Sequence, residues 1–208
     1  MSIDKVPAEQ SFEIKEKYSL EDMIVVNNLK MHFPVTAGLL KRQVASVKAV
    51  DGVSFTVRRG ETLGVVGESG SGKSTVGNCL LHRCVPTSGE IIYEGHDLAR
   101  ITKTGMRRLS KHLQMITQDP FASLDPRMDI QQIISEGMEI HKMGDKKESE
   151  EIVIRMLEMV GLNPDFRHRY PHEFSGGQRQ RISIARALAI QPNFVVCDEV
   201  VSALDVSI

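Results

Sequence analysis

A glycine-rich run set between an apolar segment and a helix-like segment constrains this chain more than any other feature of its sequence. Residues 67–74 read Gly-Glu-Ser-Gly-Ser-Gly-Lys-Ser, which matches the pattern G-x-x-x-x-G-K-[S/T]. The short apolar run Thr62–Val66 precedes the motif and predicts a strand buried in the middle of a sheet, and Lys73–Arg83 follows with helical spacing. A strand, a tight loop and a helix in this order indicate an α/β fold.

Each residue type in the loop has a physical reason to be there. Glycines permit backbone angles that turn successive N–H groups toward one point, and a helix start adds its partial positive charge at the same place. Lys73 supplies a mobile cation for outer phosphates, and the hydroxyl of Ser74 is a ligand for Mg²⁺. The alternative is a glycine-rich turn that binds nothing, but motif and context agree on a nucleoside triphosphate site. Its expected contacts are Gly67, Glu68, Ser69, Gly70, Ser71, Gly72, Lys73, Ser74 and Thr75.

A second apolar strand pattern leads into two carboxylates. Phe194–Cys197 consists of four apolar residues, and Asp198 and Glu199 follow directly. Beside the phosphate loop, such a strand would deliver Asp198 to the coordination shell of a metal ion. Glu199 would then stand beyond the metal, where a carboxylate orients and deprotonates an attacking water. Two acids after a buried strand are unremarkable by themselves, and it is the upstream loop that favours the functional interpretation.

A second glycine motif opens another helix. Ser175 is a sound N-cap, and Gly176, Gly177 and Gln178 expose N–H groups at the positive end of a helix predicted over Ser175–Ile190. One phosphate chain cannot easily use two such helix starts within a single subunit, unless another copy brings the second. The alternative is an ordinary N-capped helix after a glycine turn.

The remaining patterns divide the chain into four parts. We expect a polar leader at 1–22, the first part of a nucleotide-binding core at 23–118, a helical subdomain at 119–174, and the rest of an incomplete core at 175–208. Together they predict a P-loop NTPase core, a mixed sheet with flanking helices, with an N-terminal antiparallel β part and an inserted α-helical subdomain. The further expected elements are a strand at Met23–Phe33 ended by Pro34, an exposed excursion at Thr36–Val47, strands at Val53–Val57 and His112–Thr117, a β-turn-β unit at Gly89–Gly95, and helices at Ile130–Met138 and Glu148–Val160 with Gly161 as C-cap.

Composition excludes several classes of partner. The 208 residues carry a formal charge of −1, so the overall balance proposes no nucleic acid. No run of about 18 apolar residues is present, so no helix is expected to insert into a membrane, and the N-terminus lacks the form of a secretory signal. Cys79, Cys84 and Cys197 lack metal-ligand spacing and are expected to be reduced and buried, which fits a cytoplasmic location.

The motifs, taken in order, resemble the nucleotide-binding subunit of ABC transporters. The resemblance covers Ile24–Ile208 and includes the phosphate loop, Gln118 (Q-loop), Ser175–Gln178 (signature), Asp198–Glu199, and Ser202–Asp205 (D-loop). It implies a head-to-tail dimer with a homologous subunit, a paralogue by expectation, which holds ATP and Mg²⁺ between the phosphate loop of one subunit and the partner's signature and Asp205. It further implies that Gln118 reaches the metal and the attacking water, alongside Glu199, and that Phe33 stacks on adenine; a core or edge phenylalanine is the alternative.

The long excursion Thr36–Val47 and the stretches 118–126 and 170–178 are similar to the second ATPase subunit of di- and oligopeptide importers. This resemblance implies membrane permease subunits bound through the helical subdomain, and a peripheral position on the inner face of the cell membrane. In that family a switch histidine follows the D-loop, beyond Ile208, so a C-terminally truncated chain with an open sheet edge is expected. Two alternatives remain: a nucleotide-binding fragment without turnover, and a soluble ABC-type ATPase that does not serve transport.

Overall fold

The structure is a computed structural model that describes residues 19, 21–37, 42–119 and 123–199. The chain divides into two compact units, with the boundary between Met106 and Arg107. The expected boundaries at 22/23, 118/119 and 174/175 stay predictions.

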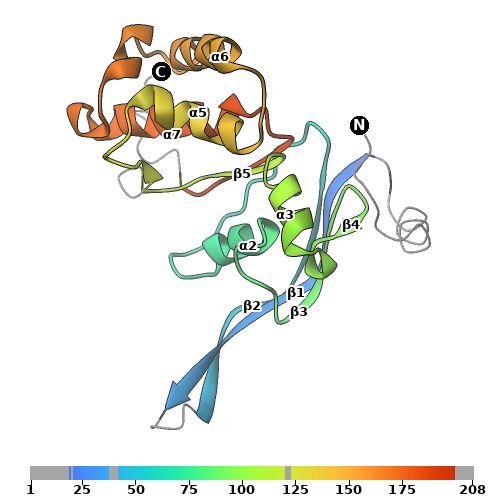
Figure 1. The fold of residues 1–208 in the computed structure, drawn as a ribbon. Helices are drawn as coiled ribbons and strands as arrows, with labels where there is room; N and C mark the ends of the chain where they lie inside the picture. Colours follow the sequence, from blue (N-terminus) through green and yellow to red (C-terminus); the bar gives the residue numbers. More distant parts are fainter. Residues whose placement is uncertain (1–18, 20, 38–41, 120–122, 200–208) are drawn as a thin grey trace. The chain divides into compact units, whose positions relative to one another are not determined.

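The first unit is built on an antiparallel sheet, as expected for the N-terminal part. Its strands are β1 (Asp22–Ala37), β2 (Arg42–Arg58), β3 (Ser88–Tyr93) and β4 (His96–Asp97), in the order β2-β1-β3-β4 (Figure 1). Ile24 and Val26 of β1 are almost fully buried, and so are Ile91 and Tyr93 of β3. Packing of these apolar side chains holds β1 at the centre of the sheet.

The strand β1 runs past Pro34, where it was expected to end. Pro34 lies opposite Ser46 in the β1–β2 ladder, and the two strands continue as a long hairpin beyond the end of β3 (Figure 1). Pairing of β1 with β3 stops at Lys30, opposite Ser88, and past the contacts of His32 with Thr87 no described strand pairs with that edge of β1. A proline is tolerated on such an edge. The predicted excursion is exposed, as expected, at 36–37, 42 and 44–47, but 36–37 and 42–47 belong to the paired strands, so the prediction of a connection between strands was wrong there; residues 38–41 lie outside the described part.

The segment Thr62–Val66, expected as a buried strand, forms no strand. Leu63 is 41%, Val65 52% and Val66 92% exposed. An apolar run is buried in a sheet only where neighbouring strands pair with both its edges, and no strand in the described part of the chain pairs with this one. The helix α2 (Lys73–Leu80) begins after this segment, as the spacing predicts, and ends before Arg83. The short helices η1 (Leu98–Arg100) and α3 (Lys103–Leu109) follow the sheet.

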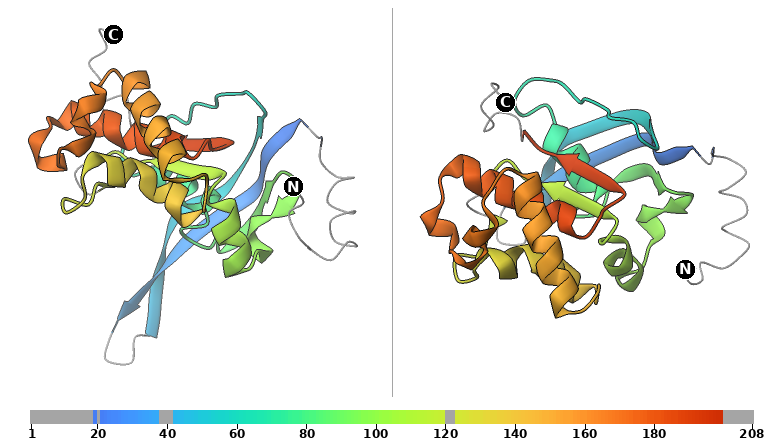
Figure 2. Two further views of the ribbon diagram at one scale, coloured as in Figure 1. Left: turned by 45° about the horizontal axis from the view of Figure 1, so that its top comes forward. Right: turned by 90° about the horizontal axis from the view of Figure 1, so that it is seen from above.

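Helices form most of the second unit. They are α5 (Ile130–Ile140), α6 (Lys146–Met159), η2 (Pro164–His168), η3 (Pro171–Glu173) and α7 (Gly176–Ala189) (Figure 2). The three α-helices α5, α6 and α7 share one apolar core; its fully buried members include Ile130, Ile134, Met138, Val153, Leu157, Ile182 and Ala185. The C-cap of α6 is Val160, and Gly161, with φ of 70°, follows it directly, one position beyond the expected C-cap.

A parallel pair of strands completes the second unit. β5 (Leu113–Ile116) and β6 (Phe194–Cys197) lie side by side, with Leu113 opposite Phe194 and Ile116 opposite Cys197 (Figure 2). The carboxyl ends of the two strands therefore meet at one edge. Cys79 is buried and Cys84 partly buried, but Cys197 is exposed, because it ends a strand whose far edge has no neighbour among the described residues. The expectation of a buried thiol was wrong for Cys197. None of the described helices is long and apolar enough to cross a membrane.

Candidate functional site

The glycines of the loop adopt the backbone angles that the motif predicts. Gly70 has φ of 79° and Gly72 φ of 94°, both in the left-handed region that favours glycine. Gly72 is the N-cap of α2, and no side chain caps this helix start. The loop therefore leaves the first N–H groups of α2 without a side-chain cap, at the positive end of the helix.

The loop is also fixed to the sheet by close packing. A Cβ atom on Gly72 would lie 2.2 Å from the carbonyl oxygen of Ala49 in β2. Only a residue without a side chain permits this approach, so the loop and β2 are held together by backbone contact. Within the loop, a Cβ on Gly67 would lie 2.8 Å from Oγ of Ser71, a side-chain atom that can rotate away, so the constraint at Gly67 is weaker.

The side chain of Lys73 lies across the loop. Its Nζ donates to the carbonyl oxygens of Gly67, at 2.8 Å, and Glu68, at 2.7 Å. The cation thus lies at the N-terminal end of the loop, bonded to two backbone acceptors. Ser74, whose hydroxyl the motif assigns to Mg²⁺, and Ser71, an expected nucleotide contact, are both exposed.

Phe33 lies on the β1–β2 hairpin and is 42% exposed. It is opposite Val47, which is 56% exposed, so the pair presents apolar surface that the described residues leave uncovered. This exposure is inconsistent with a core phenylalanine, whereas the other alternative from the sequence, an edge phenylalanine, stays open beside the adenine role.

In the second unit, two predicted residues meet at the edge where β5 and β6 end. Gln118 follows β5 and Glu199 follows β6, and Nε2 of Gln118 donates to Oε2 of Glu199 at 2.5 Å. Asp198 lies between β6 and Glu199, and its backbone N–H donates to the carbonyl of Ile116 at 3.0 Å. Glu199 has φ of 50°, a left-handed backbone that turns the chain sharply after the strand. Parallel pairing thus brings residues 81 positions apart into contact.

The start of α7 is closed by a reciprocal capping box. Oγ of Ser175 accepts from the backbone N–H of Gln178 at 3.3 Å, and Oε1 of Gln178 accepts from the backbone N–H of Ser175 at 3.0 Å. Ser175 is exposed, and Gly176 and Gly177 beside it are partly exposed. Asp205, the other residue expected to contact a partner's nucleotide, lies outside the described residues.

The arginines of α7 have structural partners. Arg179 donates to the carbonyl of Phe174 at 3.0 Å, Arg181 to that of Val160 at 3.4 Å, and Arg186 to that of Ser123. These bonds tie the helix to segments before and after α6. Because these arginines bond to backbone carbonyls, their presence on α7 has a structural explanation that needs no charged ligand.

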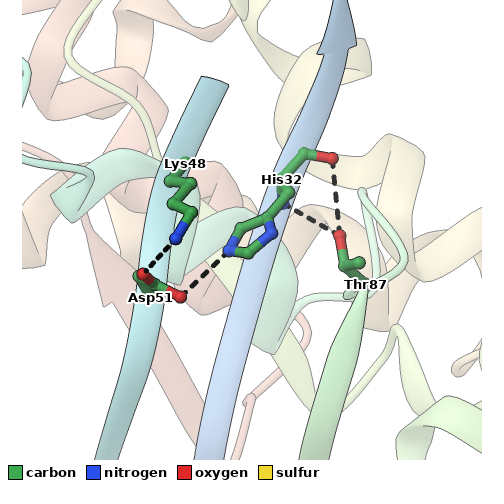
Figure 3. A network of polar contacts seen from close by, with 4 residues as sticks. All are labelled: His32, Lys48, Asp51 and Thr87. Carbon is green, nitrogen blue, oxygen red and sulfur yellow. Dashed lines mark hydrogen bonds and ion pairs between the residues drawn. The ribbon is translucent and has the colours of Figure 1, made fainter. Parts of the chain in front are cut away.

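Sequence reasoning missed a polar cluster on the first sheet. His32, Lys48, Asp51 and Thr87 come from β1, β2 and the segment before β3, and hydrogen bonds and ion pairs join them (Figure 3). No motif marks these residues. Only the pairing of β1 with β2 and β3 brings them together.

The predicted metal ligands supply hard oxygen donors: the hydroxyl of Ser74, the amide oxygen of Gln118 and the carboxylate of Asp198. Such donors suit Mg²⁺, which keeps few protein ligands and takes the rest from phosphates and water. No group of three or more His, Cys, Asp and Glu side chains in the described ranges could hold a metal ion by itself. By donor type, each of the three predicted ligands suits a magnesium ion that arrives with a nucleotide.

An α/β fold with this glycine loop at a helix start defines a P-loop NTPase. Residues 50–202 match the family model described as ABC transporter, and the chain belongs to this family. Solved structures agree: the dimeric structure of a post-hydrolysis state of the ATP-binding cassette MJ0796 bound to ADP and Pi has a TM-score of 0.78 and 25% identity, and covers 88% of this chain and 77% of that one.

Curated relatives are more similar in sequence. The oligopeptide transport ATP-binding protein AppF of Bacillus subtilis is 50% identical over 189 residues, which make up 90% of this chain and 57% of AppF. The oligopeptide transport ATP-binding protein OppF of the same organism is 49% identical over 190 residues, 90% of this chain and 60% of OppF. The chain thus spans little more than half the length of these relatives.

Proposed function

We propose that this chain belongs to an ATP-binding and hydrolysing subunit that energises uptake of di- and oligopeptides across a membrane. The phosphate loop supports the binding step. The contact between Gln118 and Glu199 carries the hydrolytic step, because a module that only binds nucleotide needs no carboxylate held by an amide at this strand edge.

Nucleotide binding would replace one set of partners of Lys73 with another. The ammonium group now bonds to the carbonyls of Gly67 and Glu68, and the outer phosphates of ATP offer stronger, charged acceptors. Backbone N–H groups at the start of α2 would bind the same phosphates, and the ring of Phe33 would stack on adenine. Phe33 is available for this role because it is exposed.

Hydrolysis needs a base and a group that orients water. Glu199 is the proposed base and accepts the proton of the attacking water, while the amide of Gln118 holds the carboxylate and the water in line. Mg²⁺, when bound, would neutralise charge on the phosphates, and Ser74, Asp198 and Gln118 would hold it. The sharp turn at Glu199 keeps its carboxylate next to Gln118 rather than along the strand.

A second, homologous subunit would complete the site. Ser175 to Gln178 form an exposed helix start that this subunit's own phosphate loop does not explain, and in a head-to-tail dimer they and Asp205 would contact the nucleotide of the partner. The structures of the ATP-binding cassette MJ0796 that share this fold are described as dimeric.

The substrate and the membrane partners rest on the relatives. AppF and OppF are named oligopeptide transport ATP-binding proteins, and we propose the same role here. Permease subunits would bind the helical part, including the segment that begins at Asp119, and hold this subunit at the inner face of the membrane.

Two variants test the proposal, with ATP affinity and phosphate release measured on each. Lys73→Ala should abolish binding of Mg-ATP, because it removes the cation of the loop. Glu199→Gln should bind ATP like the unchanged chain but release phosphate at least about 100-fold more slowly, the usual contribution of a general base. Normal, reversible binding of ATP by the Glu199→Gln variant serves as the control that this variant is folded.

Hydrolysis at an unchanged rate by Glu199→Gln would refute the role of Glu199. Tight ATP binding without any phosphate release from the unchanged chain, with its partner subunits present, would instead favour a nucleotide-binding module without turnover.

A further inference from the structure

A polar cluster crosses the first sheet close to the phosphate loop. Nε2 of His32 and Oδ1 of Asp51 are 3.1 Å apart, and Nζ of Lys48 donates to Oδ2 of the same carboxylate at 3.2 Å (Figure 3). On the other side of β1, Oγ1 of Thr87 accepts from the backbone N–H of His32 at 2.9 Å. Both the backbone and the ring of His32 are therefore held.

The cluster spans an irregularity in the ladder of β1 and β2. Met31 is opposite Val50 and His32 is opposite Lys48, so Ala49 is an extra residue on β2, a β-bulge. Further register shifts lie nearby, on either side of Leu29. Regular backbone pairing is interrupted here, and side chains are left to fix how the two strands lie against each other.

The bulge residue is also the point where the phosphate loop rests. Gly72 approaches the carbonyl oxygen of Ala49 so closely that no side chain would fit between them. The loop is thus attached to β2. Phe33, the proposed adenine platform, belongs to β1 and directly follows His32. The distance between platform and loop depends on how β1 is held against β2 at this bulge.

We propose that Asp51 is a positioning residue for nucleotide binding: its carboxylate, held by Lys48 of the same strand, clamps β2 to β1 through His32, and so sets the ring of Phe33 relative to the phosphate loop. The inference rests on the proposed function, since it assumes that Phe33 stacks on the base. Hydrogen bonds from Lys48 and His32 hold the pKa of Asp51 below its ordinary value, so the carboxylate is charged at neutral pH.

The clamp predicts a selective loss. In Asp51→Ala the loop keeps its own contacts, namely Lys73 with Gly67 and Glu68, and the packing of Gly72 on Ala49. The affinity for magnesium tripolyphosphate, which lacks a base, should therefore change less than about twofold. The affinity for Mg-ATP should fall about three- to tenfold, the range expected for a loosened aromatic contact.

A double-mutant cycle with Phe33 separates positioning from general damage. If Asp51 acts through the ring, Phe33→Ala weakens ATP binding by a similar factor, and the double variant binds no more weakly than Phe33→Ala. Asp51→Asn, which retains one oxygen acceptor, should recover part of the affinity. Glu94→Ala is the matched control, because it removes an exposed ion pair with Arg59 on the same sheet, and should leave ATP affinity unchanged.

Three results would overturn the inference: equal losses for ATP and tripolyphosphate, additive losses in the double variant, or unchanged ATP affinity in Asp51→Ala while Phe33→Ala binds more weakly. Failure of the proposed function has a different signature. The unchanged chain would then not bind Mg-ATP, or Phe33→Ala would bind it normally.

Discussion

Replacement of Gly72 by alanine tests whether backbone packing on β2 fixes the phosphate loop. The variant adds one methyl group at a residue with φ of 94°, and the new Cβ would lie 2.2 Å from the carbonyl oxygen of Ala49. Ordinary contact begins at 3.4 Å, and the obstacle is backbone that cannot rotate away like a side chain. Either the loop or β2 has to move.

The expected cost has two parts. A left-handed backbone costs a residue with a Cβ about 1–2 kcal/mol relative to glycine. Forcing extra volume into a packed contact adds about 1–3 kcal/mol. Gly60→Ala is the matched control, because Gly60 has φ of 73° and no atom within 4 Å of an added Cβ, so it loses only the first part.

The two variants are compared by urea unfolding, followed by circular dichroism, and by calorimetric titration with Mg-ATP. Gly72→Ala should lose about 2–5 kcal/mol of unfolding free energy and bind ATP at least about tenfold more weakly. Gly60→Ala should lose about 1–2 kcal/mol and bind ATP normally. If both variants unfold at the same urea concentration and bind ATP equally, the packing of Gly72 on Ala49 does not hold the loop.

Two further outcomes follow from local geometry. Ser175→Ala should lower the free energy of unfolding by about 1 kcal/mol in the same urea assay, whereas Ser175→Gly, which is a fair N-cap, should lose only a few tenths; equal losses would contradict the capping box. Burial raises the pKa of Cys79 to about 12, and the hydrogen bond with Cys84 adds to this effect. Because only the thiolate reacts, mass spectrometry should find Cys79 unalkylated by iodoacetamide at pH 8 in the native chain and alkylated in urea; equal labelling in both would contradict the burial.

Local sequence patterns predicted much of the fold. The spacing of apolar residues located the helices α5, α6 and α7, and the turn residues located the hairpin of β3 and β4, because these elements depend on neighbours in the chain. Pro34 misled, since a proline ends a strand only where a partner needs its N–H. Thr62–Val66 misled for a related reason: an apolar run does not say whether partner strands are present beside it.

In the candidate site, too, some features were predictable from the sequence and others were not. The loop angles at Gly70 and Gly72 follow from the motif. The resemblance implied that Gln118 and Glu199 both reach the attacking water, but the parallel pairing of β5 with β6 and the direct contact of the two side chains were not predicted. The hydrogen bonds of Lys73 to the carbonyls of Gly67 and Glu68 were not predictable, because every residue has a backbone carbonyl and the sequence does not show which one a side chain will contact. The contact of His32 with Asp51 depends on a bulge, and no local pattern in the chain revealed it.

The capping box of α7 decides what kind of group can approach this helix start. Oγ of Ser175 and Oε1 of Gln178 each accept a hydrogen bond from a backbone N–H at the start of the helix itself. The hydroxyl proton of Ser175 and the amide protons of Gln178 have no such internal use among these bonds. The helix start therefore faces outward with donors and with few acceptors. A ligand rich in oxygen acceptors can accept hydrogen bonds at this surface, whereas an ammonium group, which only donates, finds mainly other donors there.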